Sequence, residues 1–128
     1  MTPVLDASAV LALLYREPGH DRVAGLLGGA VVCAVNWAEV VQKLEQRGHP
    51  DPAAAVEGIR AVGVHVLPFT PAEAVTAGML WSRTRTAGLS LGDRACLAAA
   101  HGMPEGVAVT ADQAWLGLDL KVAVELIR

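Results

Sequence analysis

Four carboxylates in this chain stand where they could act together in chemistry. Two of them directly follow apolar runs and a third opens a helical stretch, which is where α/β folds place their functional groups. Because the carboxyl ends of parallel strands meet at one edge of a sheet, we expect these side chains to gather there. Oxygen ligands without cysteine or histidine favour a hard divalent cation, Mg²⁺ or Mn²⁺. The four candidate metal ligands are Asp6, Glu39, Asp93 and Asp112.

Each acid also has an ordinary structural explanation. Asp6 could cap a helix that begins just after it, because its side chain can accept hydrogen bonds from free N–H groups. Ser90 and Asp93 fit a capping box, and Asp112 could cap a short helix. Glu39 falls opposite the apolar stripe of its helix, so by itself it is a solvated surface residue. The metal-site hypothesis therefore depends on the four acids together.

Basic residues flank the third acid. Guanidinium groups beside a carboxylate-bound metal suit a phosphodiester substrate, and we take Arg94 as the candidate phosphate contact. Arg83 and Arg85 are equally explained as basic residues near the negative end of a helix dipole. The histidines form no HxxxH or HExxH pair of the kind that binds zinc, so we expect loop or surface positions for them. They are His20, His49, His65 and His101.

Composition indicates one globular domain, residues 1–128, with 53% hydrophobic residues for its core. The net charge of −3 argues against nucleic-acid binding by bulk charge. The apolar run Ala7–Tyr15 is too short to span a bilayer, and the start of the chain lacks the basic residues of a secretory signal. Cys33 and Cys96 have no CxxC spacing and suit a reducing compartment. We therefore expect a cytoplasmic protein with no membrane contact.

Short β-branched runs alternate with longer Ala- and Leu-rich segments, a pattern typical of βαβ units. The runs are apolar on both faces, which predicts central strands covered by helices on either side. The expected fold class is α/β, a three-layer α/β/α sandwich around a parallel sheet. The expected strands are Thr2–Leu5, Val31–Val35, Val64–Leu67, Val107–Thr110 and Lys121–Val124.

Several helix ends are written into the sequence. Thr70–Glu73 is a capping box with proline at the first helical position, and it predicts a long helix that ends at Gly88. Asp51-Pro52 opens another helix, and an apolar stripe predicts an amphipathic helix over Asn36–Arg47. The long helix has more apolar residues than one face buries. We therefore expect a homodimer contact at Met79–Trp81.

Taken together, these residues resemble the PIN-domain ribonucleases, and especially the VapC-type toxins of type II toxin–antitoxin (VapBC) pairs. The first segment is similar to the family's strand-Asp-x-Ser-helix opening, and the last to its Thr-x-Asp-x-x-aromatic segment. Ala111 departs from the pattern, because relatives often carry a basic or polar residue there. Length, order and spacing match over nearly the whole chain. The four segments are Val4–Leu11, Asn36–Val40, Leu89–Ala98 and Val109–Trp115.

The resemblance implies an endoribonuclease that depends on Mg²⁺ or Mn²⁺, with RNA as substrate. It also implies a small VapB-type antitoxin whose C-terminal tail covers the site, and the acidic centre could hold an arginine of that tail. Asp6 and Asp93 would be the inner metal ligands. By the same resemblance, Glu39 and Asp112 complete the catalytic set, with Ser8 and Thr110 hydrogen-bonding around it.

Two other classes of protein stay open at this point. In an aspartyl-phosphate protein, a phosphatase or receiver domain, Asp6 would be the nucleophile. Ser8 stands where the dehalogenase-type phosphatases need a second Asp. The other alternative is a PIN-like binding module without activity. For a true acidic cluster we expect repulsion between like charges to raise the pKa of at least one carboxylate in the folded protein.

Overall fold

The computed structural model describes all 128 residues, which fold around one parallel sheet of five strands. The first strand, β1, lies in the middle, and the strand order is β3-β2-β1-β4-β5. Every neighbouring pair is parallel. The strands are β1 (Thr2–Leu5), β2 (Val31–Cys33), β3 (His65–Leu67), β4 (Gly106–Thr110) and β5 (Ala123–Leu126).

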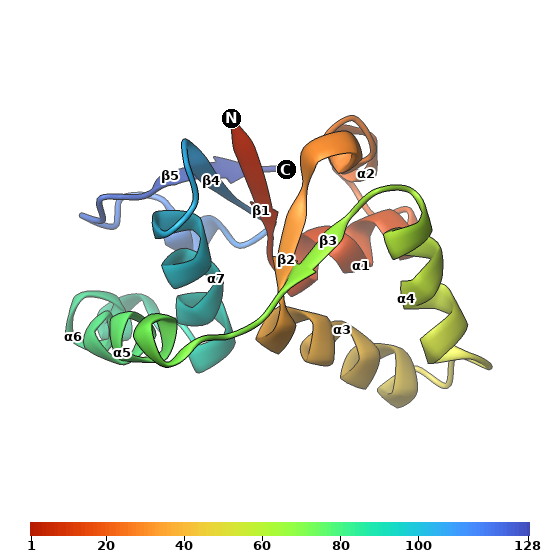
Figure 1. Cartoon of the computed structure of the whole chain (residues 1–128), viewed down its shortest axis with the longest axis horizontal. Coiled ribbons are helices and arrows are strands. Elements are labelled where there is room, and N and C mark those ends of the chain that lie inside the picture. Colours follow the sequence, from red (N-terminus) through yellow and green to blue (C-terminus); the bar gives the residue numbers. More distant parts are fainter.

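Helices cover both faces of this sheet, with α5, α6 and α7 on one side and α1 to α4 on the other (Figure 1). Val4 and Leu5 are neighbours on β1, and they belong to the two different cores. The three-layer α/β/α prediction is therefore confirmed. The helices are α1 (Ala7–Tyr15), α2 (His20–Ala24), α3 (Ala34–Gln46), α4 (Pro52–Ala61), α5 (Pro71–Met79), α6 (Trp81–Thr84) and α7 (Leu91–His101), with single 3₁₀ turns η1 (Leu27–Gly29), η2 (Arg85–Ala87) and η3 (Gln113–Trp115).

The strands are not all buried on both faces as predicted. The expectation holds for β1 and β2, whereas β3 and β5 are largely half-buried or exposed. The reason is topological, because β3 and β5 are the two edges of the sheet and each has a single neighbour. An apolar run in the sequence does not say whether its strand lies at an edge.

Two strand boundaries also differ from the prediction. The β2 strand ends at Cys33 rather than Val35, at its last pairing with β3, that of Cys33 with Leu67. Helix α3 then begins at once, at Ala34. The last strand begins at Ala123 rather than Lys121, in register with Val107 of β4.

The long helix predicted between Thr70 and Gly88 is broken into α5, α6 and η2. The Thr84 hydroxyl donates to the carbonyl of Leu80 at 2.9 Å, a side-chain bond of the kind that bends helices. The predicted ends are nevertheless confirmed: the Thr70 hydroxyl caps α5, and Gly88 closes η2 with a positive φ of 73°. None of these helices combines the length and the apolar character needed to cross a bilayer.

Candidate active site

The four acids line one cleft of about 220 Å³ at the carboxyl edge of the sheet. Asp6 follows β1 and Asp112 comes two residues after the end of β4, so adjacent parallel strands bring them together. Glu39 projects from α3, and Asp93 from the first turn of α7. The predicted gathering of these side chains is confirmed. A larger hollow, of about 410 Å³ between α4 and β3, contains one acid, Glu57, which is paired with Arg60.

Asp6 is the most buried of the four, with 4% of its surface exposed. Its carboxylate caps α1 by accepting from the Ala9 amide at 2.9 Å, and it also accepts from the hydroxyls of Ser8 at 2.7 Å and Thr110 at 2.5 Å. Capping and cleft lining thus occur in the same side chain. Burial raises the pKa of Asp6 to about 6, although these hydrogen bonds oppose the rise, and the charge of Asp93 adds a smaller increase.

The two hydroxyls join Asp6 to the segment that carries the fourth acid. Ser8 Oγ accepts from the backbone amide of Ala111 at 2.9 Å, and Thr110 Oγ1 accepts from that of Asp112 at 3.0 Å. The predicted hydrogen bonding of Ser8 and Thr110 around the acids is therefore present. Position 111 takes part through its backbone, so the departure of Ala111 from the family pattern leaves this bond intact.

Glu39 is not the solvated surface residue that its helical position suggested. It is half-buried, because α7 packs across the end of α3 and brings Gly92 against its carboxylate. The Asn36 amide, 1% exposed, donates to Glu39 Oε1 at 2.8 Å and to the Gly92 carbonyl at 2.9 Å. Burial raises the pKa of Glu39, the Asn36 bond opposes that shift, and the charge of Asp93 adds to it.

The last two acids also combine a capping role with a place in the cleft. Asp93 and Ser90 form the predicted capping box, with Ser90 N donating to Asp93 Oδ2 at 2.9 Å and Asp93 N to Ser90 Oγ at 3.1 Å. Burial raises the pKa of Asp93, and the charge of Asp112 contributes to the rise. Asp112 is exposed and caps η3 by accepting from the Ala114 amide at 2.9 Å.

Sequence reasoning missed three residues of this site. Asn36 and Gly92 hold the Glu39 carboxylate, and Lys43 brings the one basic side chain that lines the cleft. The spacing of Glu39 and Lys43, four residues apart on one helix, was the available signal for Lys43. Arg94 lies elsewhere: its guanidinium donates to the Ala77 carbonyl of α5 at 2.9 Å. Its phosphate contact stays a prediction.

Comparison with known proteins agrees with this geometry. The PIN domain family matches residues 4–119 of the chain. The chain belongs to the PIN-domain family. The match therefore favours the PIN resemblance over the receiver or phosphatase alternative. No curated protein is similar enough to match the sequence.

Solved structures with the same fold include VapBC proteins from several bacteria. The VapBC complex of Salmonella typhimurium bound to DNA contains a chain with a TM-score of 0.78 and 18% identity, covering 100% of this chain and 99% of that one. For VapBC2 of Rickettsia felis bound to promoter DNA, the TM-score is 0.73 and the sequence identity 12%, and the match covers 98% of both chains. VapC20 of Mycobacterium tuberculosis is a toxin that cleaves the sarcin–ricin loop. Its TM-score is 0.70 and its sequence identity 21%, and the match covers 87% of this chain and 90% of VapC20. At these identities the likeness concerns the fold.

The donors of this PIN domain suit a hard divalent cation, because every acid in the cleft offers carboxylate oxygens and no thiol or imidazole lines it. Three of the four carboxyls have a raised pKa, so ionising them costs more than ionising an ordinary carboxyl, and a bound cation would offset that cost. In this conformation no three of the His, Cys, Asp and Glu side chains converge on one point. Asp6, Asp93 and Asp112 each accept a backbone hydrogen bond at a helix end in this conformation.

The raised pKa of Asp6 predicts how stability depends on pH without metal. Its stabilising contribution is complete below the unfolded value of 3.8 and is lost as pH rises through the folded value of about 6. The free energy of unfolding should therefore fall across this window relative to that of Asp6→Asn, and the difference should level off above it. Urea unfolding of both proteins in chelator, from pH about 4 to about 7, measures this difference. A constant difference would contradict the burial of an ionisable Asp6.

Gly92 predicts a second effect, on the position of Glu39. A Cβ atom at residue 92 would overlap the Glu39 carboxylate. Gly92→Ala should therefore displace that carboxylate and lower the rate of a metal-dependent reaction at this cleft by about tenfold. The stability of helix α7 should be unchanged or rise by up to about 1 kcal/mol, because alanine favours the helix over glycine. Gly78→Ala in α5 is the matched control, because open space surrounds that position. Rates and melting temperatures of both variants distinguish a site effect from a helix effect; equal rates would remove the role of Gly92.

Proposed function

We propose that this PIN domain is a metal-dependent endoribonuclease, the toxin of a VapBC-type toxin–antitoxin pair. The observation that carries the proposal is the convergence of four carboxylates, from four separate segments, on one cleft of a PIN fold. The fold it shares with VapC20, a toxin that cleaves the sarcin–ricin loop, supports RNA as the substrate.

Asp6, Glu39, Asp93 and Asp112 would hold one or two Mg²⁺ or Mn²⁺ ions. When bound, such ions lower the pKa of a water molecule and neutralise charge on a phosphate. The chain's own residues supply orientation: Ser8 and Thr110 fix the Asp6 carboxylate, and Asn36 fixes that of Glu39. Lys43 lines the cleft and would bind a phosphate oxygen of the substrate, the role that the sequence had suggested for Arg94.

A VapB-type antitoxin is the proposed partner, since toxin–antitoxin complexes occur among the proteins of the same fold. The acidic cleft offers carboxylates to an arginine of such a partner. A homodimer is proposed from exposed apolar surface on α5 and α6, where Met79 is 75% and Trp81 54% exposed. Expression alone should arrest growth of the host cell, and co-expression with the neighbouring small gene should restore it. Harmless expression of a folded chain would contradict the toxin assignment.

RNA cleavage tests the activity itself. Purified protein with Mg²⁺ or Mn²⁺ should cut unstructured RNA inside the strand, and a chelator should stop the reaction. Fragment analysis distinguishes internal cleavage from trimming of the ends. Folded protein that leaves RNA intact with either ion would overturn the proposal.

Metal binding has a readout that does not need cleavage. Near neutral pH, Mg²⁺ or Mn²⁺ should raise the melting temperature by several degrees, because a ligand that binds only the folded state stabilises it. Asp93→Asn removes one carboxylate charge while its side-chain oxygen can still accept from Ser90 N, so the variant should fold and lose the shift. Thermal denaturation with each ion and with chelator gives the comparison. Equal shifts in both proteins would count against metal binding at this cleft.

A further inference from the structure

A second hollow, of about 170 Å³, lies between α5, α6, the end of α7 and the segment that precedes β5. Its lining is basic on one part and apolar on the other, and no acid contributes to it. We call it the basic hollow. Its basic residues are Arg83, His101 and Lys121, and its apolar residues are Leu80, Leu120 and Val122.

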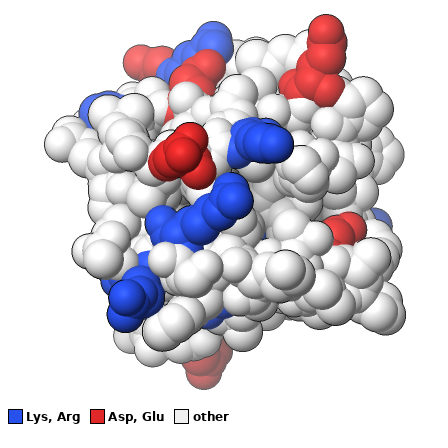
Figure 2. All heavy atoms as spheres, turned by 90° about the vertical axis from the view of Figure 1, so that its left-hand side faces the viewer, with Lys and Arg blue, Asp and Glu red and all other residues white.

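The basic side chains of this hollow have no anionic partner in the protein. Of the ten Lys and Arg side chains of the chain, two form ion pairs: Arg22 with Glu125 at 2.6 Å and Arg60 with Glu57 at 3.2 Å. No ion pair includes Arg83, His101 or Lys121. Figure 2 faces this side, and basic side chains cross the middle of it with an acidic side chain next to them. Arg83 and Lys121 place two positive charges at a hollow that no acid lines, and such a surface is complementary to an anion.

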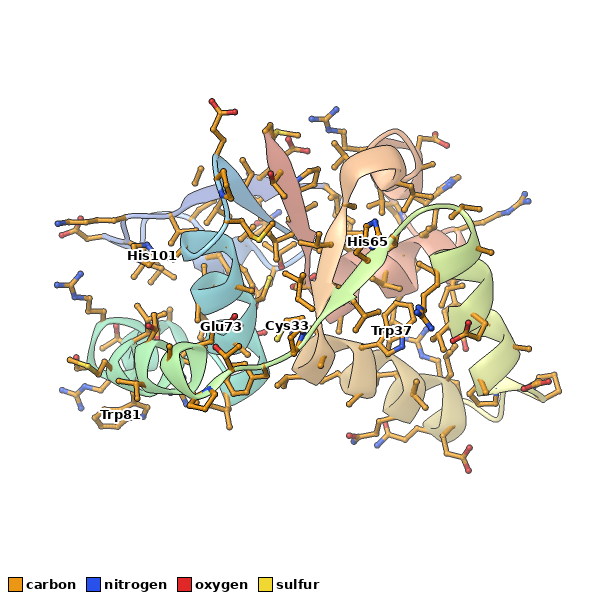
Figure 3. All side chains as sticks on the ribbon, viewed as in Figure 1. Cys33, Trp37, His65, Glu73, Trp81 and His101 are labelled. Atoms are coloured by element: carbon orange, nitrogen blue, oxygen red, sulfur yellow. The ribbon has the colours of Figure 1, made fainter.

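Because the hollow combines basic and apolar side chains, it suits an anion that also carries apolar groups. A free phosphate needs donors alone, whereas a nucleotide strand presents phosphates for basic side chains and bases for apolar surface. Figure 3 shows His101 above and Trp81 below the ribbons of α5 and α6, so Trp81 is not part of the hollow.

Two elements run from the acidic cleft to this hollow. Helix α7 carries Asp93 in its first turn and His101 at its end, eight residues apart, which is about 12 Å along the helix. The segment after β4 contributes Asp112 to the cleft and Lys121 to the hollow. A strand of a few nucleotides is long enough to reach from one to the other.

We propose that the basic hollow binds single-stranded RNA a few nucleotides away from the bond that is cut at the acids. The choice of RNA rests on the proposed function. Arg83 and Lys121 contact phosphates, and the apolar lining receives a base. The hollow thereby supplies affinity for longer RNA that the acidic cleft, which repels phosphate without metal, does not supply.

Binding without cleavage tests this site directly. Fluorescence anisotropy in chelator measures the affinity of a labelled, unstructured RNA of about 12 nucleotides at several salt concentrations. The double variant Arg83→Gln with Lys121→Gln is compared with a second double variant, Arg47→Gln with Arg60→Gln. The second removes the same charge from the residue that follows α3 and from α4. Loss of two phosphate contacts should reduce the slope of log affinity against log salt by about 1.4. The control should keep the wild-type slope, and Lys121→Arg should keep the affinity.

The other outcomes each overturn the proposal. Equal slopes for the two double variants, both folded by circular dichroism, would remove the hollow as an RNA site. Binding of an oligoglutamate peptide that needs Arg83 and Lys121, with unchanged RNA binding, would make it a protein site. If the wild-type protein cuts RNA but the Arg83→Gln, Lys121→Gln variant keeps the wild-type salt slope, the RNA site at the hollow is wrong and the proposed nuclease function stands. If the protein binds RNA through the hollow but cuts none, the proposed nuclease function is wrong and the RNA site stands.

Discussion

Asp6→Asn is expected to abolish RNA cleavage and at the same time to make the metal-free protein more stable. The variant loses a buried carboxylate charge from the cleft, which should lower the rate by about a hundredfold or more. Near neutral pH the same loss removes the cost of ionising a carboxyl whose pKa is raised from 3.8 to about 6. Two pKa units correspond to at most about 3 kcal/mol in the free energy of unfolding.

The gain in stability should fall below that limit. The Thr110 hydroxyl now donates to the Asp6 carboxylate, and it would have to accept instead if the amide nitrogen of the variant took that place. Initial rates on RNA and urea unfolding in chelator measure the two effects. Asp51→Asn is the matched control: Asp51 caps α4 by accepting from the Ala54 amide at 3.1 Å, but it is exposed and does not line the cleft. If both variants cleave RNA normally, Asp6 is a helix cap and not a catalytic residue.

Glu39→Gln is expected to impair cleavage by about ten- to a hundredfold without unfolding the protein. Gln retains a side-chain oxygen for the Asn36 amide, which now donates to Glu39 Oε1 at 2.8 Å, so the geometry should survive while the charge is lost. Because Glu39 is half-buried beside Gly92, ionising its carboxyl costs more free energy than ionising a surface glutamate, and its pKa is raised. Rates across a range of Mg²⁺ concentrations show whether added metal restores activity.

Glu45→Gln provides the comparison for this variant. Glu45 lies on the same helix, α3, and is exposed to solvent outside the cleft. Its replacement changes the net charge by the same amount and should leave the rate within about twofold. Near-wild-type cleavage by Glu39→Gln would return Glu39 to the role of a surface residue that the helical pattern alone suggested.

Local hydrogen bonding is the part of this fold that the sequence specifies most directly. The caps at Asp51 and Ser90 appear as predicted, and Thr70 caps α5 although Glu73 does not return the bond of the predicted capping box. Each cap joins a side chain to a backbone amide three residues away. The order of β-branched and Ala-rich segments likewise determines the parallel α/β/α architecture. In that architecture Asp6 and Asp112 must meet, because they follow neighbouring strands.

Burial was harder to anticipate than position. A helical pattern assumes one buried face, whereas α3 contacts the sheet on one side and the start of α7 on another, so Glu39 is covered as well. The cause of the raised pKa values shows the same limit. Repulsion between the acids was expected to dominate, but desolvation is the larger cause at Asp6, Glu39 and Asp93.

The order of amino acids alone specifies the identity and sequence of the four acids, the caps that hold three of them and the sheet that brings them to one edge. Contacts between distant segments determine the rest: that Gly92 leaves room for Glu39, that Arg94 is directed toward Ala77, and that a basic hollow forms. The hollow combines residues of α5, α6, α7 and the segment before β5. The physical reason is range, since a helix cap joins groups three residues apart, whereas solvent exclusion depends on every neighbour in space.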